Sequence, residues 1–348
     1  MAAVGIRWTT VTIGFVVAIG LLLLILSVVG IQETVTEITT ANRFILASLF
    51  GVVILWLVAW SQTLSIVLSI LDIEHNQIDC LLLFGDILLA NSIAPSTYLG
   101  GEPLAAYLLT SHAKIDYESS FATVSSVDLL NYAPMVPLAG VGILYFTVTA
   151  AIGRRIELAL AAVFTVFLLF VSGAVYGWRR RRRVVDGVAV FLGGLSAKMS
   201  SIVPGVHVVS PESLRRHLNV FVDEVEQVTA DRRNLKRGLA YSASGWLLLS
   251  TTLWLTLYAV GFTVPPEIVL FVVPLGGITN VLPFPGGLGS VESVFILLLV
   301  TTSNIPAPEA TAATFLYRAA TYWLPLLYGV GTVTLLQPIW RTTRSKVR

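Results

Sequence analysis

The fold of this protein is decided by the stretch Leu282-Pro-Phe-Pro-Gly-Gly-Leu-Gly-Ser-Val-Glu292, which separates one apolar run from the next. The first half of the chain repeats the order Pro, Gly-Gly, Glu as Pro95-Ser-Thr-Tyr-Leu-Gly-Gly-Glu-Pro103. In hydrocarbon every backbone polar group needs a partner, so such clusters occur where protein shields the chain or where it lines a cavity. The pair predicts two re-entrant or broken segments related as an internal repeat, as in transporters. Ordinary turns between spans are the alternative.

The composition places these segments in a membrane. The 348 residues are 55% hydrophobic and only 12% charged, with a mean hydropathy of +0.82, whereas soluble proteins carry about a quarter charged residues. We therefore predict an all-α polytopic membrane protein and exclude ordinary cytosolic enzymes, secreted mini-proteins and disordered tails. The single Cys80 rules out intrachain disulfides and cysteine-based metal sites.

Apolar runs indicate about eight transmembrane helices, because a span needs about 20 apolar residues. The expected spans are 8–31, 44–71, 134–152, 158–178, 239–260, 268–282, 291–302 and 310–336. The segment 78–94 is apolar but short and holds Asp86, so it is either a further span or a re-entrant helix.

The distribution of charge predicts the orientation. Arg and Lys crowd into 179–183, 198–237 and 341–348, whereas the loops near residues 33, 37, 267 and 309 are acidic. Positive residues mark the cytoplasmic side, so both termini and the central loop are expected there. A net charge of +2 is too small to favour nucleic acid as a partner. The expected units are a membrane half (1–178), a cytoplasmic basic, amphipathic linker (179–238), a second membrane half (239–340) and a basic tail (341–348).

The central linker contains one amphipathic helix. Ser210 is a suitable N-cap and Pro211 a suitable first residue. An apolar stripe follows at helical spacing, at Leu214, Leu218, Phe221, Val225, Val228 and Leu235. The helix either lies on the cytoplasmic face of the membrane or docks a partner.

Ionisable residues within apolar runs are the candidate site. A charge at membrane depth costs roughly 2.5 to 3.5 kcal/mol or more, so such residues face a cavity or pair with each other. We predict that Glu292 pairs with Arg318, either as part of a site or as a structural tie, and that Asp86 and Glu102 are the matching acidic positions of the first half. Tyr322 is a candidate groove residue or a packing aromatic. The expected joints are Gly100, Gly101, Pro285, Gly286, Gly287 and Gly289.

Signals for catalysis are weak. His75 with Asp79 and His112 with Asp116 share an H-x3-D spacing that a proton relay would use, but both pairs lie in polar connecting segments. The sequence has no serine elbow, zinc motif or phosphate loop. We therefore predict neither an enzyme nor a cofactor or metal.

The second motif, followed by Tyr317-Arg318 and Tyr322-Trp323-Leu-Pro325, resembles the signature of a flippase-like membrane family. The family is typified by the transmembrane region of lysylphosphatidylglycerol synthases, and Gly100-Gly-Glu-Pro-Leu-Ala-Ala-Tyr-Leu-Leu109 resembles its other motif. The resemblance covers nearly the whole chain. It implies a lipid translocator in the cytoplasmic membrane of a prokaryote, with a groove between two re-entrant segments. The soluble aminoacyl-transferring domain of the synthases has no counterpart in these 348 residues.

The chain departs from the family pattern at several charges. Family members usually carry Arg where this chain has Ala105, and a Glu-Arg pair with a later Asp where it reads Val127-Asp128 and Asn131. Whether charges there contribute to headgroup binding in this protein is left open.

The favoured function is movement of a lipid with a polar headgroup, such as aminoacylated phosphatidylglycerol or a polyprenyl-phosphate-linked sugar, between leaflets. One alternative is an accessory membrane subunit of a separate lipid-modifying or glycosyl transferase, docking through 210–237. Another is a membrane-embedded enzyme acting on a lipid-linked headgroup, against which the missing nucleophile and metal cluster count.

Overall fold

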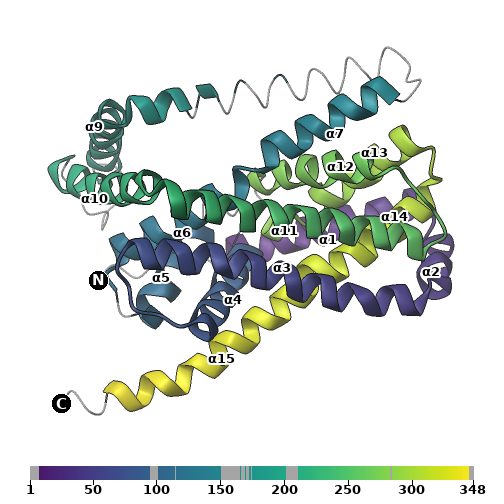
Figure 1. Cartoon of the computed structure of the whole chain (residues 1–348), viewed down its shortest axis with the longest axis horizontal. Coiled ribbons are helices and arrows are strands. Elements are labelled where there is room, and N and C mark those ends of the chain that lie inside the picture. Colours follow the sequence, from purple (N-terminus) through teal and green to yellow (C-terminus); the bar gives the residue numbers. More distant parts are fainter. Residues whose placement is uncertain are drawn as a thin grey trace.

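The computed structural model describes residues 8–94, 101–113, 115–149, 165, 169, 172–173, 175–200, 211–282 and 284–344. These residues form helices joined by short turns, and no β-strand occurs among them. The longest helices lie roughly along one direction, while α9 and α10 form a separate arm at one end (Figure 1). The all-helical prediction is confirmed.

The helices share one property: most are apolar on at least the side that faces the bundle. They are α1 (Trp8–Val29), α2 (Ile31–Thr40), α3 (Arg43–Ile70), α4 (Gln77–Ile93), α5 (Glu102–Ala113), α6 (Tyr117–Tyr132), α7 (Met135–Thr149), α9 (Arg181–Ser200), α10 (Pro211–Ala230), α11 (Arg232–Ala259), α12 (Pro266–Ile278), the 3₁₀ turns η2 (Thr279–Val281) and η3 (Pro285–Gly287), α13 (Ser290–Ser303), α14 (Ala307–Arg318), the π-helical turn η4 (Ala319–Trp323) and α15 (Leu324–Arg344).

Three helical stretches in the described part of the chain are long and apolar enough to cross a membrane. They are α3, the run Tyr117–Phe146 formed by α6 and α7, and Pro285–Ser303. A fourth is added if α1 and α2 count as one span, because Phe15–Val29 and Ile31–Thr40 are bent by 91° at Gly30. Gly30 has a φ of 111°, which glycine adopts without steric cost. The count of about eight spans stays a prediction.

The expected boundaries are wrong at several places. The span expected at 134–152 starts much earlier, because α6 is helical from Tyr117 and its polar side chains Ser120, Thr123 and Asn131 are buried by neighbouring helices. The helix that holds the span expected at 239–260, α11, begins earlier, at Arg232. The ambiguous segment 78–94 is one helix, α4, of 17 residues. Most of the expected span 158–178 lies outside the described residues.

The amphipathic helix begins at Pro211, as predicted, but ends at Ala230. Asp231 then caps α11, accepting hydrogen bonds from the backbone amides of Arg233 and Asn234. Leu235 therefore belongs to a different helix, and the expected stripe is wrong there. The apolar residues Val222, Val225 and Val228 are buried, and α10 packs against α6 and α9. Of the expected stripe, Val225 and Val228 are thus covered by the protein itself, while the expected cap, Ser210, lies outside the described residues.

Glycines allow two pairs of helices to approach closely. A Cβ on Gly85 of α4 would lie 2.6 Å from the side chain of Thr332, and one on Gly329 of α15 would lie 2.5 Å from the carbonyl oxygen of Gly85. Between α3 and α11, Trp60 fills the space beside Gly245, and its indole N–H donates to the carbonyl oxygen of Ser242 at 3.2 Å. Small residues at such crossings let backbones touch, which brings α3, α4, α11 and α15 together around the centre of the molecule.

Candidate functional site

The second Gly-Pro motif forms a tight backbone turn. Gly286, Gly287 and Gly289 have φ values of 55°, 67° and 82°, in the left-handed region that favours glycine. A Cβ on Gly286 would lie 2.1 Å from the ring of Tyr322, and one on Gly289 would lie 2.6 Å from Leu21. Both conformation and space therefore require glycine. Pro285 is buried at the start of this turn, and α13 follows it.

The predicted ion pair between Glu292 and Arg318 is present. Nε of Arg318 donates to Oε1 of Glu292 at 2.8 Å, and Nη2 donates to the carbonyl oxygen of Gly286 at 2.7 Å. Oε2 of Glu292 accepts from the backbone N–H of Gly289 at 2.7 Å. The carboxylate lies in the first turn of α13 and the guanidinium in the last turn of α14. At these positions each charge interacts favourably with the dipole of its helix. The pair ties both helices to the glycine turn.

Tyr322 connects this motif to the first half of the chain. The guanidinium of Arg318 lies over its ring, with Cζ 4.6 Å from the ring centroid, and its hydroxyl donates to the carbonyl oxygen of Ser92 in α4 at 3.1 Å. The residue belongs to the π-helical turn η4, which ends at Trp323, two residues before Pro325. Proline has no amide for the i→i−4 bond and its ring crowds the preceding turn, which explains the widened helix here.

The first Gly-Pro motif has a comparable but not identical geometry. Helix α5 begins at Glu102, directly after Gly101, where a Cβ would lie 2.4 Å from Oδ1 of Asn91. The hydroxyl of Ser125 donates to Oε2 of Glu102 at 2.9 Å. Unlike Glu292, Glu102 has no basic partner among the described residues. Gly100 lies outside the described residues.

Asp86 is buried with partners of its own. One carboxylate oxygen pairs with Nδ1 of His112 in α5, and the other accepts from the hydroxyl of Thr332 in α15 at 3.2 Å. The carboxylate is 1% exposed. It joins α4, α5 and α15, and it does not meet Glu102 or the Glu292–Arg318 pair.

Neither H-x3-D pair forms. Asp116 caps α6 by accepting from the backbone N–H of Ser119 at 3.0 Å, while His112 contacts Asp86 instead. Asp79 and Asn76 cap α4, and the His75 ring bonds to Ser65 and to the carbonyl oxygen of Ile73. The spacing therefore builds no relay at either place, because Asp116 and Asp79 cap helices and the two histidines bond to other groups.

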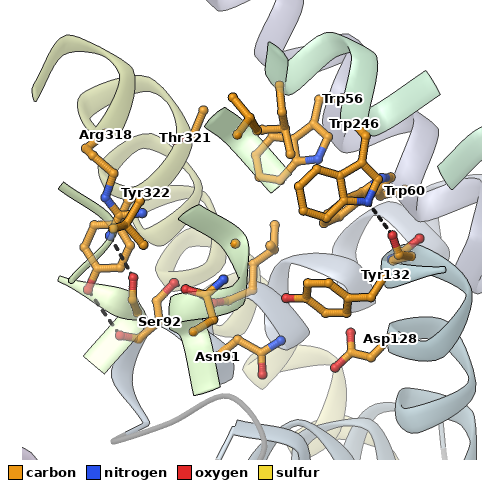
Figure 2. Close-up of a pocket in the computed structure, with 18 of the residues that line it drawn as sticks. Trp56, Trp60, Asn91, Ser92, Asp128, Tyr132, Trp246, Arg318, Thr321 and Tyr322 are labelled. Atoms are coloured by element: carbon orange, nitrogen blue, oxygen red, sulfur yellow. Dashed lines mark hydrogen bonds between the residues drawn. The ribbon is translucent and has the colours of Figure 1, made fainter. Parts of the chain in front are cut away.

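A cavity of about 150 Å³ lies between α3, α4, α6, α11, η3 and η4. Figure 2 shows Arg318 and Tyr322 at one side and Asp128, Tyr132 and three tryptophans at the other. Of the predicted site residues, Arg318, Tyr322 and Gly286 line it, whereas Asp86, Glu102, Glu292, Gly101, Pro285, Gly287 and Gly289 do not. Its lining is Trp56, Trp60, Phe84, Ile87, Leu88, Asn91, Ser92, Asp128, Asn131, Tyr132, Trp246, Leu249, Val273, Gly277, Asn280, Gly286, Val291, Phe295, Tyr317, Arg318, Thr321 and Tyr322.

Four polar atoms of this lining are buried without a hydrogen-bond partner in the described part of the protein. They are Nε1 of Trp56, Oδ1 of Asn91, Oδ2 of Asp128 and Oδ1 of Asn131. Buried polar groups are normally paired, and each unpaired one costs about 1 to 3 kcal/mol or more. The concentration of unpaired atoms around one cavity indicates that a polar occupant completes them.

Sequence reasoning missed most of these residues. The tryptophans are scattered over α3 and α11, and only folding brings their rings within 5.4 Å (Trp56 to Trp60) and 5.9 Å (Trp60 to Trp246), measured between centroids. Asp128 was noted only as a departure from a family pattern. The available signal was its place beside the apolar residues Val127, Leu129 and Leu130.

No group of three His, Cys, Asp or Glu side chains in the described residues is arranged to hold a metal ion. The polar groups at the cavity are amide, indole, hydroxyl, carboxylate and guanidinium groups. They suit hydrogen bonding and charge pairing with a ligand.

Comparison with known proteins identifies the family of this chain. Residues 11–329 match the model of the lysylphosphatidylglycerol synthase TM region. The chain belongs to this family. Two relatives from Methanothermobacter thermautotrophicus, each described as a UPF0104 membrane protein, are each 25% identical to it; one match covers 92% of both chains and the other 82% of both. The glycosyltransferase AglD of Haloferax volcanii is 24% identical over 68% of this chain and 40% of its own length.

Family membership and the apolar helices together make this an integral membrane protein. The resemblance stated from the two Gly-Pro motifs is confirmed, since the matched region contains both.

Proposed function

We propose that the protein is a lipid translocator, which passes a polar headgroup through this cavity while the lipid tails stay in the bilayer. The observation that carries this proposal is the cavity itself: unpaired polar atoms surround it inside a protein of apolar helices. An unpaired polar atom costs free energy while the cavity is empty, and it can form a hydrogen bond with a polar group that passes through.

The physical barrier to lipid movement is desolvation of the headgroup. Transfer of a polar group into an apolar medium without hydrogen bonds costs roughly 2 to 7 kcal/mol, and a lined path lowers that cost by replacing the lost water contacts. The amide and carboxylate oxygens of Asn91, Asn131 and Asp128 would accept hydrogen bonds from the headgroup.

The volume of the cavity limits what it holds in this conformation. About 150 Å³ is room for about five water molecules at about 30 Å³ each, and is below the roughly 300 to 1,000 Å³ of typical ligand sites. It accommodates a small polar group and not a whole lipid. Translocation therefore requires the cavity to open, in turn, toward each leaflet.

The two Gly-Pro motifs are suited to act as the joints of that movement. The two helices that flank each motif pack against each other: α4 with α5, and α12 with α13. A glutamate lies in the first turn of each second helix, Glu102 and Glu292. These parallels support two re-entrant segments related as an internal repeat.

The proposed orientation places both termini and the linker 179–238 in the cytoplasm. In Figure 1, α9, α10 and the end of α15 lie at one end of the molecule, and α2 lies at the other. The first group carries seven arginines, whereas α2 carries Glu33 and Glu37 and no basic residue. The positive-inside rule supports this assignment.

The proposal is tested with purified protein in vesicles that contain a lipid whose headgroup can be quenched or modified from outside. Wild-type protein should speed exchange between leaflets for at least one of phosphatidylethanolamine, phosphatidylglycerol, aminoacylated phosphatidylglycerol and a polyprenyl-phosphate sugar. Arg318→Ala should weaken exchange. Gly287→Val should stop it, because a Cβ there would lie 2.5 Å from Oδ1 of Asn280 and 2.8 Å from Val291.

The control is Gly51→Val in α3, where nothing lies within 4 Å of the added Cβ. It should keep exchange near the wild-type rate. If every lipid crosses at the rate of empty vesicles while the protein is folded by size-exclusion chromatography, the translocator proposal is wrong.

A second candidate function rests on the similarity to the Haloferax glycosyltransferase, which covers 68% of this chain. The protein would then be an accessory membrane subunit of a separate transferase. The exposed face of α9 and α10, with Arg182 and Asp223 at its surface, is available for docking. Co-purification of a transferase that Arg182→Glu abolishes, without lipid exchange, would favour this function.

A further inference from the structure

Two acidic side chains come together where α5 packs against α6. The hydroxyl of Ser125 in α6 donates to Oε2 of Glu102 in α5 at 2.9 Å. Asp128 follows Ser125 by three residues, and residues at this spacing are neighbours on one helix face, with Cβ atoms about 5 to 6 Å apart. Asp128 is 7% exposed, and its electrostatic neighbour among the described residues is Glu102. Each carboxyl group therefore lies within reach of the charge of the other.

No cation compensates this pair in the described part of the chain. Helices α4, α5 and α6 contain no Arg or Lys, and His112 of α5 pairs with Asp86. Arg318 lies at the other side of the cavity (Figure 2) and pairs with Glu292. The helices packed around the pair present these ionisable groups, each exposed or bonded elsewhere: exposed Arg43 of α3; Asp79, which caps α4; Glu224 of α10, which bonds to Ser119; and exposed Arg232, Arg233, Lys236 and Arg237 of α11.

This environment disfavours two negative charges at once. A charge at membrane depth costs roughly 2.5 to 3.5 kcal/mol or more, and two carboxylates that share a site each disfavour ionisation of the other. One proton on the pair leaves one charge in place of two. The second Gly-Pro motif differs in this respect, because Arg318 balances Glu292 there.

The unpaired atoms beside Asp128 agree with a proton on the pair. Asn131 is 1% exposed, follows Asp128 by three residues on the same face of α6, and has no partner for its Oδ1 in the described structure. Oδ1 of Asn91 is likewise unpaired and borders Gly101, directly before Glu102. An ionised carboxylate only accepts hydrogen bonds, whereas a protonated one also has an O–H donor. A proton thus supplies the kind of donor that these acceptors lack.

From this geometry we infer that Glu102 and Asp128 form a proton-binding site that couples movement of the headgroup to a proton gradient. The inference rests on the proposed function and names its source of energy. In the coupling step one O–H bond breaks, its electron pair stays on the carboxylate oxygen, and the proton passes to water on the side to which the cavity has opened. Release leaves two negative charges that repel α5 from α6. The break at Gly101, directly before α5, allows α5 to move.

The first experiment imposes a proton gradient on vesicles that contain the purified full chain. The probes are the lipids of the exchange assay, and potassium with valinomycin holds the membrane potential at zero. With one proton moved per lipid, a gradient of one pH unit should enrich a transported lipid about tenfold in one leaflet at steady state. The reversed gradient should enrich the other leaflet.

Glu102→Gln should abolish the enrichment, because an amide does not take up or release the proton. This readout is a steady-state ratio, so a change in the rate of exchange alone does not alter it. The matched control is Asp223→Asn, since that carboxylate is 66% exposed on α10, and it should keep the enrichment. A protonophore should remove the enrichment from wild-type protein.

A second experiment detects the proton without transport. The infrared absorption of a protonated carboxyl group is separate from that of a carboxylate. Wild-type protein in detergent should contain a protonated carboxyl group at neutral pH, which Asp128→Asn removes and Asp223→Asn does not. In Glu102→Gln the group should lose its proton at a lower pH than in the wild type, because the neighbouring negative charge is gone.

Lipid exchange that a proton gradient does not bias, or that a sodium gradient biases instead, would refute proton coupling and leave the translocator proposal intact. Absence of exchange for every lipid would refute translocation and coupling together, and the infrared result would then decide the proton site alone. The site itself would be overturned by absence of the protonated group at neutral pH, by its persistence in Asp128→Asn, or by a titration that Glu102→Gln leaves unchanged.

Discussion

Loss of either charge of the Glu292–Arg318 pair should destabilise the protein more than loss of a charge from an exposed side chain. At 2.8 Å and an effective dielectric constant of about 20, two unit charges attract by about 6 kcal/mol before desolvation is subtracted. The side chains are only 10% and 2% exposed, so removal of one partner leaves the other buried without its counter-charge. Arg318→Gln and Glu292→Gln should each reduce the free energy of unfolding by about 3 to 5 kcal/mol.

The double variant distinguishes an interaction from two separate roles. With both charges removed, no lone charge stays buried, so the combined loss should fall short of the sum of the single losses by about 1 to 3 kcal/mol. Unfolding can be followed in mixed micelles titrated with SDS, for the four proteins of the cycle. The control cycle is Arg182 with Asp223, which are 4.0 Å apart, with side chains 78% and 66% exposed, and its coupling should stay below about 1 kcal/mol.

Strictly additive losses for Glu292 and Arg318 would refute the reasoning, since the charges would then not interact. A loss for Arg318→Gln equal to that of an exposed arginine would equally contradict burial of the pair.

Three further predictions concern backbone, orientation and pH. Gly286→Ala should lower the unfolding temperature strongly, because its Cβ would lie 2.1 Å from the ring of Tyr322 at a φ of 55°. Single cysteines at Thr36 and Glu212, labelled in intact cells with an impermeant thiol reagent, should react at Thr36 only. Arg181 donates a hydrogen bond to Glu226 and holds the pKa of that carboxyl below its ordinary value of 4.5, so the tie between α9 and α10 should be present above pH 4.5 and be lost as the pH falls through the lowered pKa; hydrogen exchange of α9 and α10 measures it.

Each of these three predictions has a control variant or background. Gly261→Ala also adds a Cβ at positive φ, 90°, but with nothing within 4 Å, so it should cost only the backbone strain of about 1 kcal/mol. The labelling uses a Cys80→Ala background, since Cys80 is the single native cysteine, and reaction at Glu212 alone would reverse the orientation. Glu226→Gln should remove the pH dependence of exchange, and an unchanged dependence would assign it to another group.

The parts of the fold that follow from local chemistry were predictable. The apolar runs indicated helices, Pro211 marked a helix start, and the two deep charges Glu292 and Arg318 had to meet because neither is stable alone in hydrocarbon. The Gly-Pro motif predicted a backbone break, and three of its glycines have positive φ.

The rest depended on partners far away in the sequence. Helix α6 looks like a polar loop, since its Ser, Thr and Asn side chains are satisfied or buried only when α3, α5, α10 and α11 surround it. His112 is 26 residues from Asp86, so an i, i+4 spacing with Asp116 could not reveal its true contact. The cavity combines α3, α4, α6 and α11, and no pattern within one helix indicates which side chains converge on it.

The contact between Gly85 and Gly329 limits how the two halves of the molecule can move. A Cβ on Gly329 would lie 2.5 Å from the carbonyl oxygen of Gly85, so at this point the backbones of α4 and α15 touch with no side chain between them. Sliding along either axis would drive Leu89 or Thr332 into the opposing backbone, since both already border the contact. Rotation of α4 against α15 about this crossing point would keep the two glycines in contact. For the proposed translocator, such a rotation would open the cavity toward one leaflet as it closes the other.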